Sequence, residues 1–159
     1  MQKLGASRRF LQTVTILLSL LFLGFPAQAK DIAFSTSMIE IGKHHFTIEL
    51  ATSNVQLEHG LMFRNYLAPD HGMLFVYHQP TLARMWMKNT LIPLDMIFID
   101  AKGRIVTIEH NTTPESPAII SSPEPVKAVL ELAAGTAEKK HIKVGDKVKH
   151  AVFVSHPVR

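Results

Sequence analysis

The spacing of turn-forming residues is the feature that most limits the fold, because it leaves only short apolar segments between the turns. Residues 43–51, "KHHFTIELA", alternate apolar and polar side chains, which is typical of a strand with one buried face. "MLFVY" at residues 73–77 indicates a buried strand, and "DAKG" at residues 100–103 predicts a hairpin turn. We therefore expect a mostly β protein, all-β or α+β, whose short strands form a small compact barrel or sandwich.

One short helix is expected near residues 53–60. Ser53 and Gln56 have the spacing of a capping box, and Gly60 is well placed to end the helix. Residues 111–125 are rich in proline and predict a long extended loop. This loop is not a domain boundary, because the residues that follow it are too few to fold alone.

The N-terminal segment, residues 1–29, has the features of a secretory signal peptide. Lys3, Arg8 and Arg9 give a basic start, an apolar run follows, and the small-residue signal "AQA" ends at Ala29. The apolar run is too short to span a bilayer comfortably, which disfavours the alternative of an uncleaved membrane anchor. We expect export by the general secretory route, cleavage after Ala29, and one periplasmic or secreted domain, residues 30–159, with no membrane contact.

Removal of this segment leaves an almost neutral domain. The chain has 17 Lys and Arg against 13 Asp and Glu, and three bases but no acids precede residue 30, which leaves 14 against 13. So little net charge attracts no nucleic acid, and we expect no nucleic-acid partner. The absence of cysteine excludes disulfides and a thiol nucleophile.

The histidines are scattered and do not have the spacing of metal ligands. No Gly-rich phosphate loop and no nucleophile elbow occur either. The sequence therefore indicates neither a metal nor a cofactor, and it assigns no catalytic residue.

The block "WMKNTLIPLD" contains the only tryptophan of the chain, Trp86. Lys88 and Asn89 offer donors to an anionic or carbonyl-bearing ligand, and Trp86 offers an apolar wall. The structural alternative is a turn shaped by Asn89 and Thr90, in which Lys88 faces Asp95 as an ion pair.

Arg64 lies between apolar residues just after the expected helix. Its planar fork suits a carboxylate, which is either internal or part of a ligand. Between these, an internal partner is favoured, and Asp95 and Glu131 are the candidates.

Together, "GLMFR", "GMLFVY", "WMKNTLIPLDMIFID", "VLELAAG" and "VGD" resemble the DUF192 family, also called UPF0127, from about residue 39 to residue 154. The resemblance implies a small, mostly β domain, often behind a signal peptide in bacteria, and it implies no established activity. The aromatic residue that usually precedes the tryptophan is Met85 here. The family's motif positions fall on Gly60, Leu61, Met62, Arg64, Gly72, Met73, Trp86, Met87, Lys88, Asn89, Thr90, Pro93, Leu94, Asp95, Glu131 and Gly135.

These observations favour a non-enzymatic binding module of the cell envelope, for a small anionic or carbonyl-bearing ligand or an envelope protein. One alternative is a hydrolase of envelope polymers, with Asp95 or Glu131 as general acid and base; a carboxyl of raised pKa in a cleft would favour it. Another is a protein-interaction domain, which an exposed Trp86 would favour. The expected ligand-binding residues are Arg64, Trp86, Lys88, Asn89, Thr90, Asp95 and Glu131.

Overall fold

The computed structural model describes residues 32–154, so the expected signal peptide and its cleavage site lie outside the described residues. Within that range no helix has the length and apolar character that crossing a membrane requires.

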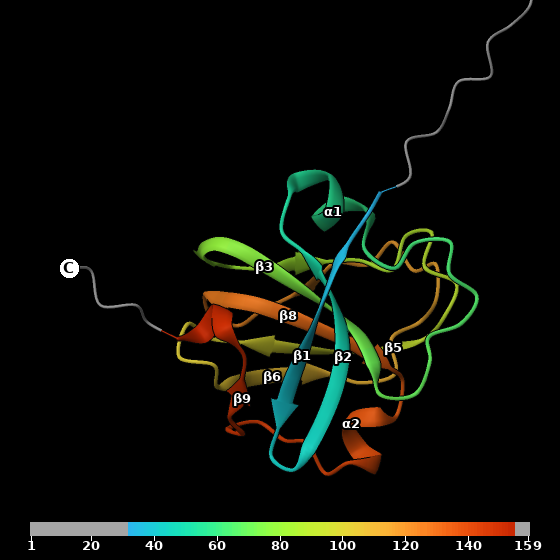
Figure 1. Cartoon of the computed structure of the whole chain (residues 1–159). Coiled ribbons are helices and arrows are strands. Elements are labelled where there is room, and N and C mark those ends of the chain that lie inside the picture. The colour runs from blue at the N-terminus through green and yellow to red at the C-terminus, as the bar shows by residue number, and fades with distance from the viewer. Residues whose placement is uncertain (1–31, 155–159) are drawn as a thin grey trace, which may run out of the picture. The chain divides into compact units, whose positions relative to one another are not determined.

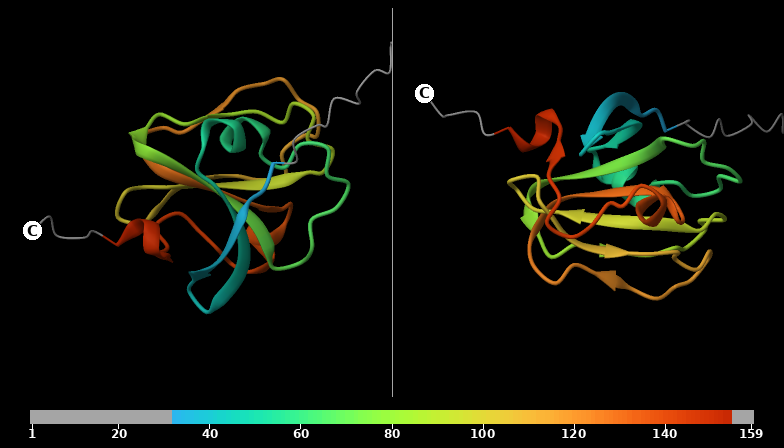
Figure 2. Two further views of the ribbon diagram at one scale, coloured as in Figure 1. Left: turned by 45° about the horizontal axis from the view of Figure 1, so that its top comes forward. Right: turned by 90° about the horizontal axis from the view of Figure 1, so that it is seen from below.

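A seven-stranded, mostly antiparallel sheet forms the body of the domain, in the order β6-β5-β8-β3-β2-β1-β9. Figures 1 and 2 show that it curls into a half-barrel. The predicted mostly β fold class is therefore confirmed. A small second sheet pairs β4 with β7. The strands are β1 Ser35–Ile41, β2 His44–Ala51, β3 His71–Thr81, β4 Arg84–Met85, β5 Leu94–Ile99, β6 Ile105–Glu109, β7 Ile120–Ser121, β8 Val126–Ala133 and β9 Val148–Lys149.

The short helix expected near residues 53–60 is α1, Asn54–His59. Its capping box is complete, because Ser53 accepts from the amide of Gln56 and the Gln56 side chain accepts from the amide of Ser53. A second short helix, α2 at Thr136–Lys139, and a 3₁₀ turn, η1 at Ala151–Phe153, complete the elements. The predicted loop of residues 111–125 is mostly irregular, but it contains β7.

The two faces of the sheet bury separate cores, and strand parity decides which side chain joins which core. On β8, Leu130 and Leu132 belong to one core, whereas Glu131 lies on the opposite face with the other. On β5, Asp95 shares its face with Ile97 and so belongs with the first core. Glu131 and Asp95 therefore lie on opposite faces of the sheet.

Close approach of β3 to β8 depends on Gly72. A Cβ at this position would overlap the backbone carbonyl oxygen of Glu131 and lie 2.7 Å from Leu132 Cδ2. The small residue thus lets these two neighbouring strands pack at the place where Glu131 is displayed.

Candidate functional site

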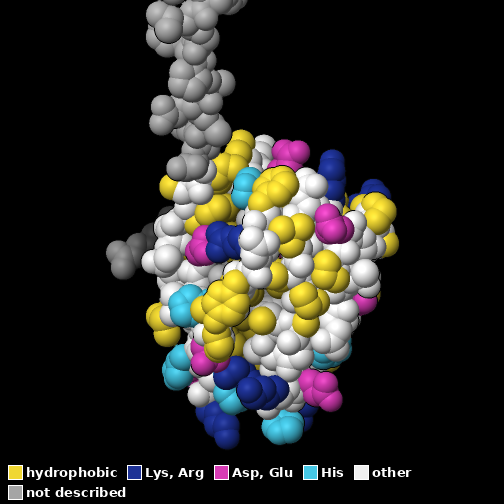
Figure 3. Space-filling model, turned by 90° about the vertical axis from the view of Figure 1, so that its right-hand side faces the viewer, with side chains coloured by type: hydrophobic (Ala, Val, Ile, Leu, Met, Phe, Trp, Pro, Cys, Tyr) yellow, Lys and Arg dark blue, Asp and Glu magenta, His cyan; other side chains and the backbone are white. Residues whose placement is uncertain are grey.

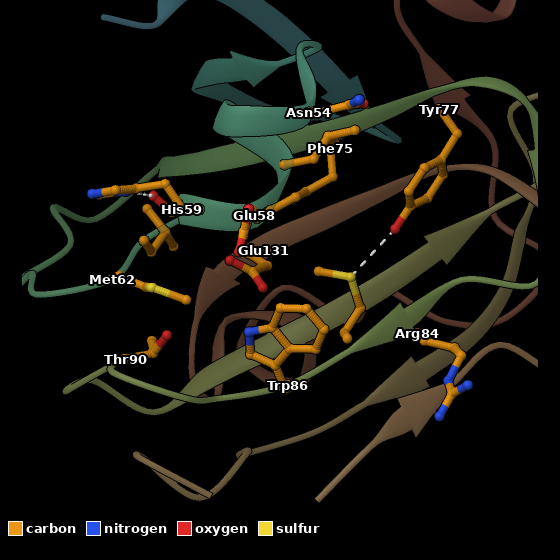
Figure 4. A pocket seen from close by; sticks show the side chains of 14 residues that line it. Asn54, Glu58, His59, Met62, Phe75, Tyr77, Arg84, Trp86, Thr90 and Glu131 are labelled. Atoms are coloured by element: carbon orange, nitrogen blue, oxygen red, sulfur yellow. Dashed lines mark hydrogen bonds between the residues drawn. The ribbon is translucent and has the colours of Figure 1, made fainter. Parts of the chain in front are cut away.

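A hollow of about 350 Å³ lies between α1, β3, β8 and the segment of residues 84–90. Figure 4 shows its side chains converging on the space between Glu131 and Trp86. Gly60 brings the end of α1 close to this space, since a Cβ there would lie 2.9 Å from the ring of Phe75. The lining residues are Asn54, Leu57, Glu58, His59, Gly60, Leu61, Met62, Phe75, Tyr77, Arg84, Met85, Trp86, Thr90 and Glu131.

Glu131 is the polar centre of the hollow. In the sheet it stands between Met73 on β3 and Met96 on β5, and both methionines are fully buried. The residue is 4% exposed, and burial raises the pKa of its carboxyl to about 8. Among residues 32–154, no side chain or amide forms a hydrogen bond or ion pair with this carboxyl. It is therefore protonated at neutral pH and directed at the hollow, where it can both donate and accept a hydrogen bond.

Aromatic side chains form the walls around Glu131. Trp86 is 39% exposed and reaches the hollow with its ring (Figure 4). The hydroxyl of Tyr77 donates to the sulfur of Met85 at 3.4 Å, so Tyr77 presents mainly its ring. Burial, together with the negative charge that Glu131 carries at high pH, raises the pKa of Tyr77 to about 12.

A second hollow of about 300 Å³ adjoins the first, and both share Trp86, Glu58, His59 and Met62. Exposed Lys88 and half-buried Asn89 line this second hollow.

Asn89 adopts a left-handed φ of 58°, and its carbonyl accepts from the amide of Phe63 at 2.8 Å. This contact ties the turn after Trp86 to the chain that follows α1. The polar block beside the tryptophan therefore serves as a turn and as a wall of the second hollow.

Arg64 lines neither hollow. Its guanidinium forms two hydrogen bonds to the carboxylate of Glu49 on β2, at 2.5 and 2.7 Å, which raises the pKa of Arg64. The prediction of an internal acid was right in kind, but Asp95 and Glu131 were the wrong partners.

Asp95 also lies away from both hollows. It is fully buried and accepts from the amides of Asn111 at 3.0 Å and of Ala137 at 2.9 Å, with the ring of His110 at 3.9 Å. It thus holds the turn after β6 and the start of α2 in place. The predicted ion pair between Asp95 and Lys88 is wrong, because the lysine is exposed near the opposite face of the sheet.

The seven residues expected to bind ligand thus separate into three groups. Trp86, Thr90 and Glu131 line the first hollow, Lys88 and Asn89 line the second together with Trp86, and Arg64 and Asp95 line neither.

Sequence reasoning missed other residues that line the first hollow. Glu58 and His59 come from the predicted helix, Tyr77 from the predicted strand of residues 73–77, and Arg84 from the segment before Trp86. The sequence signal that could have identified these residues was their position in, or next to, elements that the sequence predicted. In the described part of the chain, no group of three or more His, Asp or Glu side chains could hold a metal ion.

Comparison with known proteins finds one family and four similar chains of solved structure, including one from Sinorhizobium meliloti and one from Novosphingobium aromaticivorans. A model of the family DUF192, described as "Uncharacterized ACR", matches residues 37–150, a range that includes every residue lining the two hollows except Ile32. No curated protein matches this chain.

The first similar crystal structure is of a Sinorhizobium meliloti 1021 protein for which a role in transcription regulation has been suggested. It is 44% identical with a TM-score of 0.75, and the match covers 77% of this chain and 98% of that one. The second is of a protein of unknown function from Novosphingobium aromaticivorans DSM 12444. It is 34% identical with a TM-score of 0.71, and covers 75% of this chain and 94% of that one.

Proposed function

This chain belongs to the DUF192 family, and because that family has no described activity, we propose from the hollow itself that the protein is a non-enzymatic binding module of the cell envelope. A small ligand, or the end group of a larger one, lies in the hollow beside Glu131. The flat or apolar part of this ligand packs against Trp86, and its polar group forms a hydrogen bond with Glu131. The module acts in the periplasm or outside the cell, after removal of residues 1–29.

The observation that carries this proposal is the lack of a protein partner for Glu131. Among the described residues, every side-chain nitrogen or oxygen that is sealed from solvent has a partner, so the oxygens of this unpartnered carboxyl are reached from the hollow. The fully buried Met73 and Met96 on both sides offer no donor, and the carboxyl points at an open space. A ligand that pairs with the carboxyl would supply the hydrogen bond that no protein group provides.

The binding test uses Trp86 as its own reporter, because it is the only tryptophan in the chain. We expect a screen of cell-wall fragments, amines and small metabolites to yield compounds that change Trp86 emission and raise the melting temperature. Glu131→Leu keeps a similar volume without the polar group, and Trp86→Leu removes the wall. Each substitution should reduce the affinity for such a compound by roughly tenfold or more.

Arg64→Met is the matched control, since that guanidinium is held by Glu49 outside the hollow. It should leave the affinity unchanged. The binding site would lie elsewhere if a compound bound both Glu131→Leu and Trp86→Leu as tightly as the wild type. The same conclusion would follow if Arg64→Met weakened binding equally.

The second candidate function is a hydrolase of envelope polymers, and the raised pKa of Glu131 favours it. A carboxyl that stays protonated at neutral pH can donate its proton to a leaving oxygen while water attacks the carbon from which that oxygen departs. Glu58 is the other carboxyl in the hollow and would accept the proton of that water. Asp95 has no part in this scheme, because it lies on the opposite face of the sheet.

Turnover distinguishes the two candidates. A hydrolase would release product from a bound envelope fragment, and Glu131→Gln would stop that release while the fragment still binds. A binding module would return the fragment unchanged.

The remaining options have less support. Figure 3 shows that apolar side chains on one face are interrupted by polar atoms and backbone, so this face has no continuous apolar patch for a protein partner. Trp86, although exposed, belongs to the wall of the hollow. The transcriptional role suggested for the Sinorhizobium protein has no electrostatic support here, because 14 bases and 13 acids after residue 29 give almost no net charge.

A further inference from the structure

The charges around the first hollow indicate what kind of polar group it receives. Its titratable lining groups are Glu58 and His59 from α1, Tyr77 from β3, Arg84 from β4 and Glu131 from β8. The neighbouring strand β5 contributes only a buried methionine beside the carboxyl of Glu131. Arg84 is exposed, and Figure 4 shows its guanidinium at the edge of the hollow and directed away from Glu131.

An anionic ligand group would bind weakly beside Glu131. The guanidinium of Arg64 is occupied by Glu49, and Lys88 is exposed in the adjoining hollow. A bound carboxylate would therefore approach two carboxyls, Glu131 and Glu58, without a facing cation. One hydrogen bond from protonated Glu131 would be its main compensation, and ionisation of Glu131 would turn that contact into repulsion.

A cationic ligand group would make favourable contacts in the same place. The rings of Trp86 and Tyr77 offer faces that attract a positive charge, and the carboxylate of Glu58 adds attraction from the rim. Glu131 can lose its proton and accept a charge-assisted hydrogen bond. Because burial raises the pKa of Glu131 to about 8, losing that proton at pH 7 reduces affinity by only about tenfold.

We propose that the group bound at Glu131 is a protonated primary amine, carried on an apolar or aromatic body small enough for a hollow of about 350 Å³. This inference rests on the proposed binding function and names its ligand class. On binding, the proton of Glu131 passes to solvent, and an N–H of the ammonium group donates to the resulting carboxylate. The body of the ligand lies along Trp86.

Three probes of similar shape test this inference: phenethylamine, 2-phenylethanol and 3-phenylpropionate, which is an anion at pH 7. Each is titrated into the purified protein while Trp86 emission is recorded. We expect the amine to bind roughly tenfold more tightly than the alcohol, and the anion to bind most weakly. Calorimetry at pH 7 in two buffers of different ionisation enthalpy should show release of about 0.9 proton per bound amine.

Glu131→Gln keeps the shape and a hydrogen-bonding group but cannot take a negative charge. In this variant we expect the preference for the amine over the alcohol to disappear, together with the proton release. Glu109→Gln changes an exposed acid on β6, which pairs with Met96 two strands away from Glu131, and should keep both. Circular dichroism of each variant confirms that the fold is retained.

Two results would overturn the amine assignment. The first is an alcohol or anion that binds as tightly as the amine and is lost in Glu131→Leu, which would leave the hollow as a binding site for another ligand class. The second is amine binding without proton release, or with equal strength in Glu131→Gln. If no probe changes Trp86 emission, the amine assignment also fails, and the compound screen alone then decides the binding function.

Discussion

Replacing Glu131 by Gln should stabilise the protein increasingly as the pH rises. Burial between two methionines raises the pKa of the carboxyl from its ordinary 4.5 to about 8 in the folded protein. Between these values the folded state holds a proton that the unfolded chain has lost. The contribution of this group to stability is therefore complete below pH 4.5 and disappears progressively as the pH rises to about 8.

The size of the effect follows from that interval. A pKa raised from 4.5 to about 8 corresponds to a loss of about 5 kcal/mol across the window, since one pKa unit is worth about 1.4 kcal/mol. At pH 7 the loss is about 3 kcal/mol. Gln does not titrate, so the difference in unfolding free energy between variant and wild type should grow by these amounts as the pH rises.

Urea unfolding of both proteins, followed by circular dichroism at several pH values from 4.5 to 8.5, measures this difference. All other titrating groups are shared and largely cancel. Glu109→Gln, at an exposed position of β6, is the control and should give a flat difference. A difference for Glu131→Gln that changes by less than about 1 kcal/mol over the window would show that the carboxyl is ionised in the folded protein, and the reasoning would be refuted.

Three further predictions concern the frame around the hollow. Asp95→Ala should lower the unfolding free energy by roughly 3 kcal/mol in urea titrations, because two backbone amides lose their acceptor in a buried place; Asp95→Asn, which keeps one acceptor oxygen, should lose less. Gly72→Ala should reduce stability by about 3 kcal/mol, because its Cβ would overlap the carbonyl of Glu131; a melting temperature equal to wild type would contradict that contact. Arg64→Met should change stability by about 1 kcal/mol or less, because its ion pair with Glu49 is partly exposed; a larger loss would mean that the pair anchors the chain after α1.

Local signals in the sequence predicted local structure well. The alternation of residues 43–51 corresponds to β2, and the spacing of Ser53 and Gln56 corresponds to a complete capping box. These features depend on neighbours within a few residues, so periodicity and side-chain type are enough to predict them.

The site was harder to predict because it depends on distant pairing. β8 is central and buried on both faces, so its apolar run does not reveal that Glu131 faces the hollow. Arg64 meets Glu49 across a contact that no periodicity in either segment signals. The lining residues Glu58 and His59 lie on a predicted helix, but the face that this helix turns to β3 is set by packing.

The position of β8 also governs when the domain can assemble. β3 and β5 each pair with β8, and the two halves of the sheet, β9-β1-β2-β3 and β5-β6, are joined through it. During synthesis the N-terminus leaves the ribosome first, so the sheet cannot close until β8, Val126–Ala133, has also been released. Long-range pairing of this kind slows folding, because the intervening chain must close into a loop before the strands can pair. Glu131 lies on β8, so the hollow cannot be completed before this strand pairs with β3 and β5.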